Sequence, residues 1–91
     1  MKYVIVVARS ARKVMDRLPD NERRRMAAAI LELKNDPLPP GKKVKELKGV
    51  DGNVYRLRVG GRRVIYEISR NEIHVLSIIN RNDLDRWLKK R

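Results

Sequence analysis

The sequence Tyr55-Arg-Leu-Arg-Val-Gly-Gly-Arg-Arg-Val-Ile-Tyr-Glu-Ile68 predicts a β-hairpin that turns at Gly60-Gly61. Apolar and charged residues alternate on both sides of the turn, and a Gly-Gly pair suits a two-residue loop because glycine readily adopts positive φ at both positions. Pairing across the turn sets Arg58 opposite Arg63. One face then carries apolar side chains that helices should cover: Tyr55, Leu57, Val59, Val64, Tyr66 and Ile68. The other face carries Arg56, Arg58 and Arg63.

The segments on either side of the hairpin complete a small α+β domain that spans 1–91. We expect further strands at 2–7, 44–47 and 72–79, since apolar and β-branched residues run or alternate there. Apolar residues at helical spacing predict two helices that form a hairpin, one capped by Ser10 and ending before Pro19, and one capped by Asp20 or Asn21. A last helix is expected at 83–91. The sequence therefore predicts an antiparallel sheet of about four to five strands, an N-terminal helix hairpin on one face and a short C-terminal helix.

Charge is the strongest feature of the composition. The chain has 91 residues, with 23 Lys and Arg against 11 Asp and Glu, a net charge of +12. Phosphate backbone, an acidic protein or anionic lipid would complement this potential, and nucleic acid is the first choice. The alternative is that these side chains only solvate helix faces.

The same composition excludes several classes of function. The absence of Cys and the presence of a single His exclude disulfides, thiolate zinc sites, a Cys nucleophile and a His-based metal cage. A domain of this length has no room for a large enclosed substrate cavity. No apolar stretch approaches the roughly 20 residues that span a bilayer, and no signal-peptide core is present. We expect a cytoplasmic protein with no cofactor, no metal and no membrane partner.

The opposed arginines are the main candidate site. Like charges facing each other destabilise a hairpin, so a cluster at Arg56, Arg58 and Arg63 indicates that an anion such as a phosphate binds among them. The alternative is that the arginines project into water and bridge to nearby carboxylates. Arg81 follows the last strand and joins them only if the final loop turns toward them. Further basic residues that would contact backbone phosphate, or only solvate the surface, are Lys42, Lys43, Lys45 and Lys48.

Apolar residues share the arginine face. Strict alternation puts Ile65, Leu76 and Ile78 there, to be covered by Leu84, Trp87 and Leu88 of the last helix or by a partner's helix. Trp87 either packs in this way or stacks on a base. Glu67 and His74 lie opposite each other in the second hairpin, where a surface ion pair is favoured over an acid–base couple.

The hairpin, together with Leu47-Lys-Gly49 and Val75-Leu-Ser-Ile-Ile-Asn-Arg81, resembles the RelE/ParE toxin superfamily over nearly the whole chain. The resemblance implies a small curved antiparallel sheet, two helices on one side and a variable C-terminal helix. It also implies a toxin that cuts mRNA in the ribosomal A site without metal, by attack of the RNA 2′-OH on the adjacent phosphate. By position, Arg56 and Arg58 match the basic pair on the hairpin's first strand and Arg63 the basic residue on the second. Arg81 matches the late arginine credited with charge stabilisation or proton donation.

Proton transfer is where the sequence departs from the family. Trp87 stands where some active members have a tyrosine that acts as acid or base, and an indole cannot do this; without a gap the nearest match is Asp85. Arg56 replaces a lysine used as base elsewhere, and arginine stays protonated above pH 12.

The leading hypothesis is therefore the toxin of a type II toxin–antitoxin pair, acting as a ribosome-dependent mRNA endoribonuclease. Its expected partners are the ribosome and mRNA, a cognate acidic antitoxin that lays an amphipathic helix on Ile65, Leu76 and Ile78, and operator DNA bound by the toxin–antitoxin complex. Two alternatives stay open: a ParE-like inhibitor of DNA gyrase, and a non-catalytic nucleic-acid-binding module.

Overall fold

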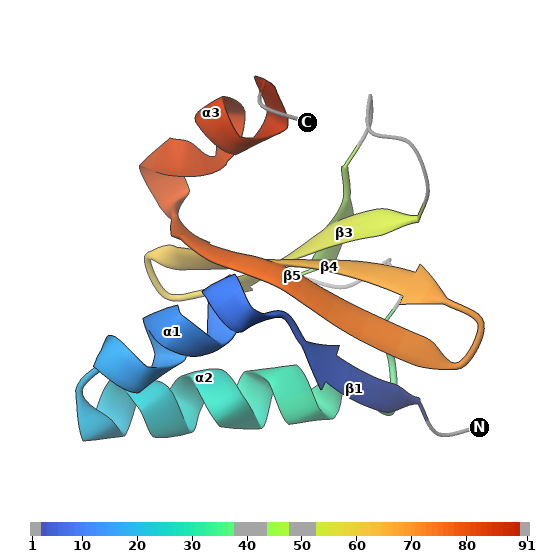
Figure 1. Cartoon of the computed structure of the whole chain (residues 1–91), viewed down its shortest axis with the longest axis horizontal. Helices are drawn as coiled ribbons and strands as arrows, with labels where there is room; N and C mark the ends of the chain where they lie inside the picture. Colours follow the sequence, from blue (N-terminus) through green and yellow to red (C-terminus); the bar gives the residue numbers. More distant parts are fainter. Residues whose placement is uncertain (1–2, 38–43, 48–52, 90–91) are drawn as a thin grey trace.

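The fold is an open five-stranded sheet with helices on both faces. The computed structural model describes residues 3–37, 44–47 and 53–89. Along the chain these form β1 (Val4–Val7), α1 (Arg9–Arg17), α2 (Asp20–Glu32), β2 (Val44–Glu46), β3 (Val54–Val59), β4 (Arg62–Ser69), β5 (Glu72–Asn80), a 3₁₀ turn (Arg81–Asp83) and α3 (Leu84–Lys89). The strand order is β1-β5-β4-β3-β2. Helices α1 and α2 lie against one face of the sheet, and α3 lies over the other face (Figure 1). The predicted α+β class is confirmed.

The central hairpin has the predicted register. Strands β3 and β4 are antiparallel, with Val59 paired to Arg62, Arg58 to Arg63 and Tyr55 to Tyr66. Of the two turn glycines only Gly60 has positive φ, at +59°. A positive φ at the first central position alone is the pattern of a type II′ turn, and the predicted two-residue loop at Gly60-Gly61 is confirmed.

The sheet is mixed rather than wholly antiparallel. Strand β1 pairs with β5 in parallel, with Val4 opposite Glu72 and Val7 opposite Val75, while the other neighbouring pairs are antiparallel. An apolar run of four residues predicts a strand but carries no information about the direction of its partner. The parallel pairing of β1 was therefore not predicted.

Most of the core lies between the helix pair and the sheet. On the helix side it is formed by Ala11, Leu18, Met26, Ile30 and Leu33, and on the strand side by Tyr55, Leu57, Val59, Val64, Tyr66, Ile73, Val75 and Ile78. The buried helix residues fall at the spacing that the sequence predicted. Helix residues that recur every 3.6 positions thus pack against strand residues that recur every two positions. Burial of this shared face is the main stabilising term of the fold.

A β-bulge in β5 overturns one sequence-based assignment. Tyr66 pairs with Val75 and Ile65 with Ser77, so Leu76 is an extra residue in β5. One extra residue shifts the facing of the rest of a strand. Ile78 consequently lies in the core under α1 and α2, whereas Leu76 and Ile79 lie on the opposite face. The placement of Ile78 on the arginine face was wrong, and Ile79 takes that place.

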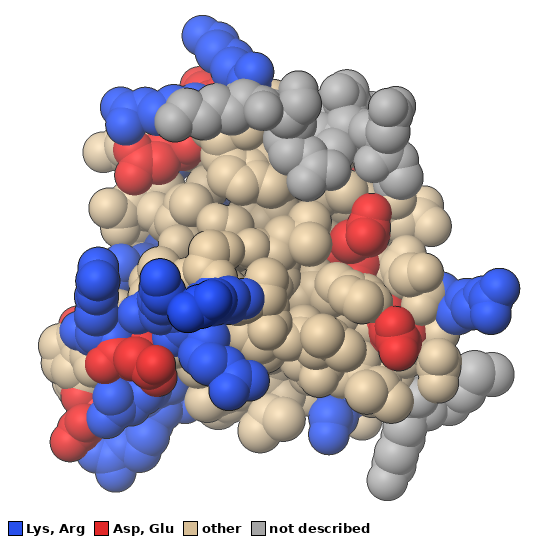
Figure 2. Space-filling model, viewed as in Figure 1, with Lys and Arg blue, Asp and Glu red and all other residues tan. Residues whose placement is uncertain are grey.

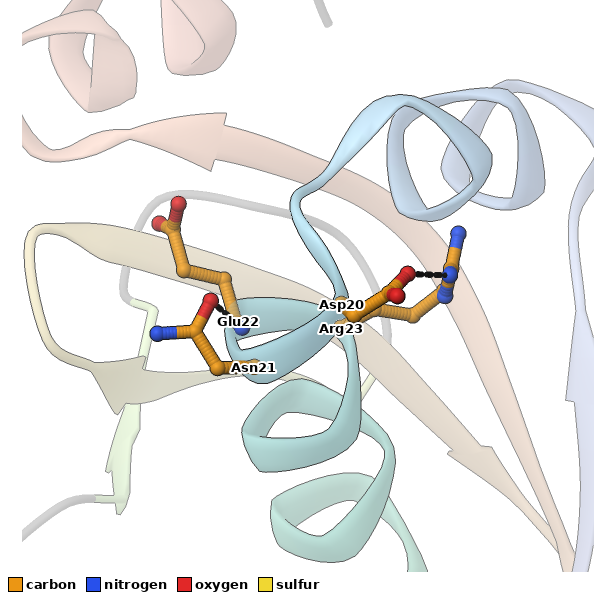
Figure 3. Close-up of polar contacts among 4 residues, drawn as sticks. All are labelled: Asp20, Asn21, Glu22 and Arg23. Atoms are coloured by element: carbon orange, nitrogen blue, oxygen red, sulfur yellow. Dashed lines mark hydrogen bonds and ion pairs between the residues drawn. The ribbon is translucent and has the colours of Figure 1, made fainter.

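The starts of both N-terminal helices also differ from expectation. Ser10 lies inside α1, which begins at Arg9, and its hydroxyl donates a hydrogen bond to the carbonyl of Leu76 (3.1 Å). Helix α2 begins directly after Pro19, and no side chain caps it. Within its first turn Asp20 pairs with Arg23, and the amide oxygen of Asn21 accepts from the backbone N–H of Glu22 (Figure 3). Within the part of the chain that the structure describes, no helix is long and apolar enough to cross a membrane.

Candidate functional site

The four predicted arginines meet on the sheet face opposite α1 and α2. Arg58 lies directly across from Arg63, and Arg56 is two residues back along β3. Arg81 follows β5, and its backbone N–H donates to the carbonyl of Gly61 (2.9 Å), which holds the start of the 3₁₀ turn against the hairpin loop. The final loop therefore turns toward the hairpin. We call Arg56, Arg58, Arg63 and Arg81 the arginine cluster.

Arg63 is the fixed centre of this cluster. Its side chain is buried, with only 8% of the residue exposed. Its Nη1 donates to the carbonyls of Gly60 (3.2 Å) and Arg62 (3.0 Å), so the guanidinium lies folded against the turn. Burial lowers the pKa of Arg63 below its usual value, and the charges of Arg56, Arg81 and Arg58 lower it further, in that order. The other three cations of the cluster therefore lie close enough to act on the Arg63 guanidinium.

The charge and the donors of the cluster are chemically suited to an anion. Within the described residues, the guanidinium groups of Arg58 and Arg81 make no hydrogen bond and no ion pair, and both residues are exposed, so their donors are accessible to a ligand. Like charges that face each other across a hairpin destabilise the fold. A bound ligand with several negative oxygens would attract each of these cations and so offset their mutual repulsion. A phosphate group has the charge and the acceptor geometry that guanidinium forks match.

One predicted lysine extends the site. Lys45 of β2 pairs with Arg56 of β3 and is exposed. Its position beside Arg56 continues the basic face toward the edge of the sheet. Lys42, Lys43 and Lys48 lie outside the described residues, so their phosphate contacts stay predictions.

A second, smaller apolar cluster adjoins the arginines. It consists of Leu47, Val54 and Ile65, with Leu76, Ile79, Leu84, Trp87 and Leu88 packed against it. Trp87 and its α3 neighbours thus cover Ile65, as predicted for the last helix. The helix has six residues, none of them buried. Base stacking by Trp87 stays a prediction.

The one histidine does not serve the site. Glu67 and His74 are opposite each other as predicted, but His74 Nε2 contacts Glu72 Oε1 (2.8 Å) on its own strand. The predicted ion pair with Glu67 was wrong, because residues two apart on one strand share a face and Glu72 reaches the ring first. Both residues lie near the start of β5, whereas Arg81 follows its end. Among the described residues no group of three or more His, Cys, Asp or Glu side chains could hold a metal ion.

A broader basic surface lies on the helix side of the molecule. Figure 2 shows Lys and Arg side chains gathered over α1 and the start of α2, with acidic side chains among them. Helix α1 supplies four exposed cations: Arg9, Arg12, Lys13 and Arg17. The charge excess is therefore spread over both faces and not confined to the arginine cluster.

Comparison with known proteins finds solved structures with the same fold and a family model that matches the chain. Residues 5–84 match the family model described as the ParE toxin of the type II toxin–antitoxin system parDE. No curated protein matches the sequence. The archaeal RelE–RelB complex from Pyrococcus horikoshii OT3 contains a chain that is 29% identical, with a TM-score of 0.77 over 89% of this chain and 97% of that one.

Two further solved structures share the fold. A chain of the RelB–RelE antitoxin–toxin complex from Methanococcus jannaschii is 24% identical, with a TM-score of 0.70 over 90% of this chain and 96% of that one. The YoeB dimer from Staphylococcus aureus is 15% identical, with a TM-score of 0.70 over 87% and 97%. With the family model matching residues 5–84, the chain belongs to the ParE toxin family of type II toxin–antitoxin systems, within the RelE/ParE superfamily.

Proposed function

We propose that the protein is a ribosome-dependent endoribonuclease that inhibits translation by cutting mRNA in the ribosomal A site. The observation that carries this proposal is the arginine cluster, in which a buried, hydrogen-bonded Arg63 is surrounded by three further guanidiniums. A cluster of this kind suits a reaction in which negative charge grows on a phosphate.

The proposed reaction is attack of an RNA 2′-oxygen on the adjacent phosphorus. The new O–P bond forms while the bond from phosphorus to the 5′-oxygen breaks; the 2′-OH loses a proton and the leaving oxygen gains one. The pentacoordinate transition state carries more negative charge than the starting diester, so guanidiniums already fixed around it stabilise it more than the ground state. Arg63 is fixed by the turn carbonyls, and Arg58 and Arg81 supply exposed donors.

Growth inhibition tests the need for the cluster. Induced expression of the wild type is expected to stop growth, and Arg81→Glu is expected to abolish this effect because it places a carboxylate where the phosphate would bind. Arg86→Glu is the matched control, since it reverses a charge on α3, where the side chain is 74% exposed. Arrest by Arg81→Glu at the wild-type level would count against the proposal.

The proposed partner is an acidic antitoxin. Support comes from the net charge of +12 and from the relative at 29% identity, whose structure is a RelE–RelB complex. The proposed antitoxin helix lies over Ile65 and Leu76 and displaces the short α3; Ile78 takes no part, because it is buried on the other side of the sheet. A structure of the pair with this face bare would refute the placement.

The second candidate function is inhibition of DNA gyrase. The family model that matches is that of the ParE toxin, and Trp87 cannot transfer protons, whereas a gyrase inhibitor needs no ribonuclease residues. A supercoiling assay with purified gyrase discriminates: inhibition together with intact mRNA on ribosomes would favour this function. The third candidate, a non-catalytic module on operator DNA, predicts binding that weakens steeply with salt and no cleavage of RNA.

A further inference from the structure

A cavity of about 210 Å³ lies on the helix side of the hairpin turn, between α2 and the ends of β3, β4 and β5. Its floor is apolar and includes Leu18, Met26 and Val59, while its rim carries Glu22, Arg25, Arg62 and Asn80 beside Gly60 and Gly61. We call it the hairpin pocket. Nothing in the arginine cluster accounts for it, since Arg62 points to the helix face and Arg63 to the opposite one.

The two arginines of the rim are held differently. Arg62 is fixed, with Nη1 donating to Asn80 Oδ1 (3.2 Å) and Nη2 lying 3.9 Å from Glu22 Oε1. Arg25 is exposed, and its Nη1 lies 3.5 Å from the position that a Cβ at Gly60 would occupy. Among the described residues Arg25 has no hydrogen bond and no ion pair. The pocket therefore combines one oriented guanidinium with one whose donors bond to no described residue and are accessible to a ligand.

The neighbouring charged residues leave the Arg25 guanidinium open to a ligand. Figure 3 shows that Arg23 is engaged by Asp20 on the other side of the helix from Glu22. Glu22 is the one carboxylate on the rim, against two guanidiniums, and it is already shared with Arg62. A glycine turn without side chains leaves backbone open to close approach by a ligand.

We propose that the hairpin pocket binds a phosphate group of a nucleotide, between Arg25 and Arg62, with the attached sugar or base over Met26 and Val59. The inference rests on the proposed function in one respect: the nucleotide belongs to the RNA strand whose reacting phosphate lies in the arginine cluster. The two sites meet at the same loop, because Arg63 and Arg81 bond to the carbonyls of Gly60 and Gly61 while Arg25 lies over Gly60. The strand would thus be held on both sides of the turn.

Methionine methyl NMR tests the pocket on the intact protein. Met26 lines the hairpin pocket, whereas Met15 lines a separate groove beside β1 and serves as an internal control. Addition of adenosine 5′-monophosphate at constant ionic strength is expected to shift the Met26 methyl signal and leave Met15 in place. Arg25→Gln is expected to weaken this binding by about tenfold, the loss of one charged hydrogen-bond pair. Arg24→Gln, an exposed neighbour that does not line the pocket, is the matched control and is expected to bind as the wild type.

Three results would overturn the inference: no shift of Met26, an equal shift with adenosine lacking the phosphate, or unchanged binding by Arg25→Gln. Cleavage of mRNA on ribosomes is scored separately. A protein that cleaves but shows no Met26 shift lacks the pocket site and keeps the proposed function. A protein that shows the Arg25-dependent shift but cleaves nothing keeps a nucleotide phosphate site, and its link to RNA cleavage is refuted.

Discussion

At the scale of single residues, Tyr66 shows how a polar group is tied into the core. It is fully buried, its ring stacks on Tyr55 with centroids 5.6 Å apart, and its hydroxyl donates to the carbonyl of Pro37 (2.7 Å). Burial raises the pKa of Tyr66 well above its ordinary value of 10, with smaller contributions from Tyr55 and Asp36. The segment after α2 is thereby fastened to the middle of the sheet.

Tyr66→Phe is expected to lower the free energy of unfolding by about 1 kcal/mol at pH 7, because the Pro37 carbonyl loses its donor. A group whose pKa is higher in the folded than in the unfolded state stabilises the fold below the unfolded pKa and ceases to do so as pH rises through the folded one. Wild-type stability should therefore fall above pH 10, and less steeply in Tyr66→Phe. Urea unfolding at pH 7 and pH 11 measures both effects. Tyr3→Phe is the control, since its hydroxyl bonds to no described residue; equal slopes in all three proteins would contradict the prediction.

The second hairpin turn carries a strained residue. Arg70 has a φ of +57°, a left-handed conformation that costs a residue with a Cβ about 1 kcal/mol or more. Arg70→Gly removes the strain and is expected to leave stability unchanged or raise it by up to about 0.5 kcal/mol, after the greater freedom of glycine in the unfolded chain is counted. Asn71→Gly, at a position without positive φ, is expected to destabilise. Thermal melts compare the two, and the same sign for both would refute this explanation.

At the scale of elements, the bulge in β5 is where the start of α1 is bonded to the sheet. The Ser10 hydroxyl on α1 donates to the carbonyl of Leu76, and the backbone N–H of Ala8 donates to Val75 beside it (2.8 Å). The bulge in β5 is thus the place where hydrogen bonds hold α1 against the sheet.

Ser10→Ala is expected to lower the free energy of unfolding by about 0.5–1.5 kcal/mol, since the Leu76 carbonyl loses a partner. Because the bond joins α1 to β5, amide exchange should speed up in α1 more than in the β3–β4 hairpin. Hydrogen exchange followed by mass spectrometry measures the difference. Ser69→Ala at the exposed end of β4 is the control, and a uniform change across the protein in Ser10→Ala would contradict the local role.

The local pattern of apolar residues predicted the helices and strands better than it predicted how they pair and pack. The β3–β4 register and the buried stripe of Met26, Ile30 and Leu33 follow directly from alternation and helical spacing. The sheet face on which Ile78 lies could not be predicted in this way. In Leu76-Ser-Ile-Ile79 apolar residues occupy both even and odd positions, so alternation does not assign a face, and no glycine or proline signals a bulge. The parallel partner of β1 depends on tertiary proximity, which a period of two does not encode. The contact of His74 with Glu72 is local, since the two residues share a face of β5, but the same alternation also places Glu67 beside His74 and does not decide between the two carboxylates.

At the same scale, the arginine cluster divides into a predictable and an unpredictable part. Arg56, Arg58 and Arg63 share a face once the Gly60-Gly61 register is accepted. Arg81 joins them through the bond from its N–H to Gly61, a loop contact with no sequence signal. The resemblance to a known family supplied Arg81 where periodicity could not. The approach of Arg25 to Gly60 likewise depends on how α2 packs on the sheet.

At the scale of the whole molecule, the charge excess of +12 opposes folding in the absence of an anion. Arg58→Gln is therefore expected to raise the melting temperature in dilute chloride buffer, because it removes a like charge directly opposite Arg63. Phosphate is expected to stabilise the wild type more than chloride at equal ionic strength, and to stabilise Arg58→Gln less than the wild type. Arg86→Gln serves as the charge-matched control. If phosphate and chloride act equally on the wild type, the cluster does not bind phosphate.

The central claim is that the arginine cluster cuts RNA. Its most direct test is primer extension on mRNA carried by programmed, translating ribosomes, with wild type, Arg81→Ala and Arg86→Ala compared. The account predicts cleavage within the A-site codon by the wild type and Arg86→Ala, and loss of at least about a hundredfold in rate for Arg81→Ala, as expected when a donor to a charged transition state is removed. Uncut mRNA with wild-type protein, or undiminished cleavage by Arg81→Ala, would contradict it.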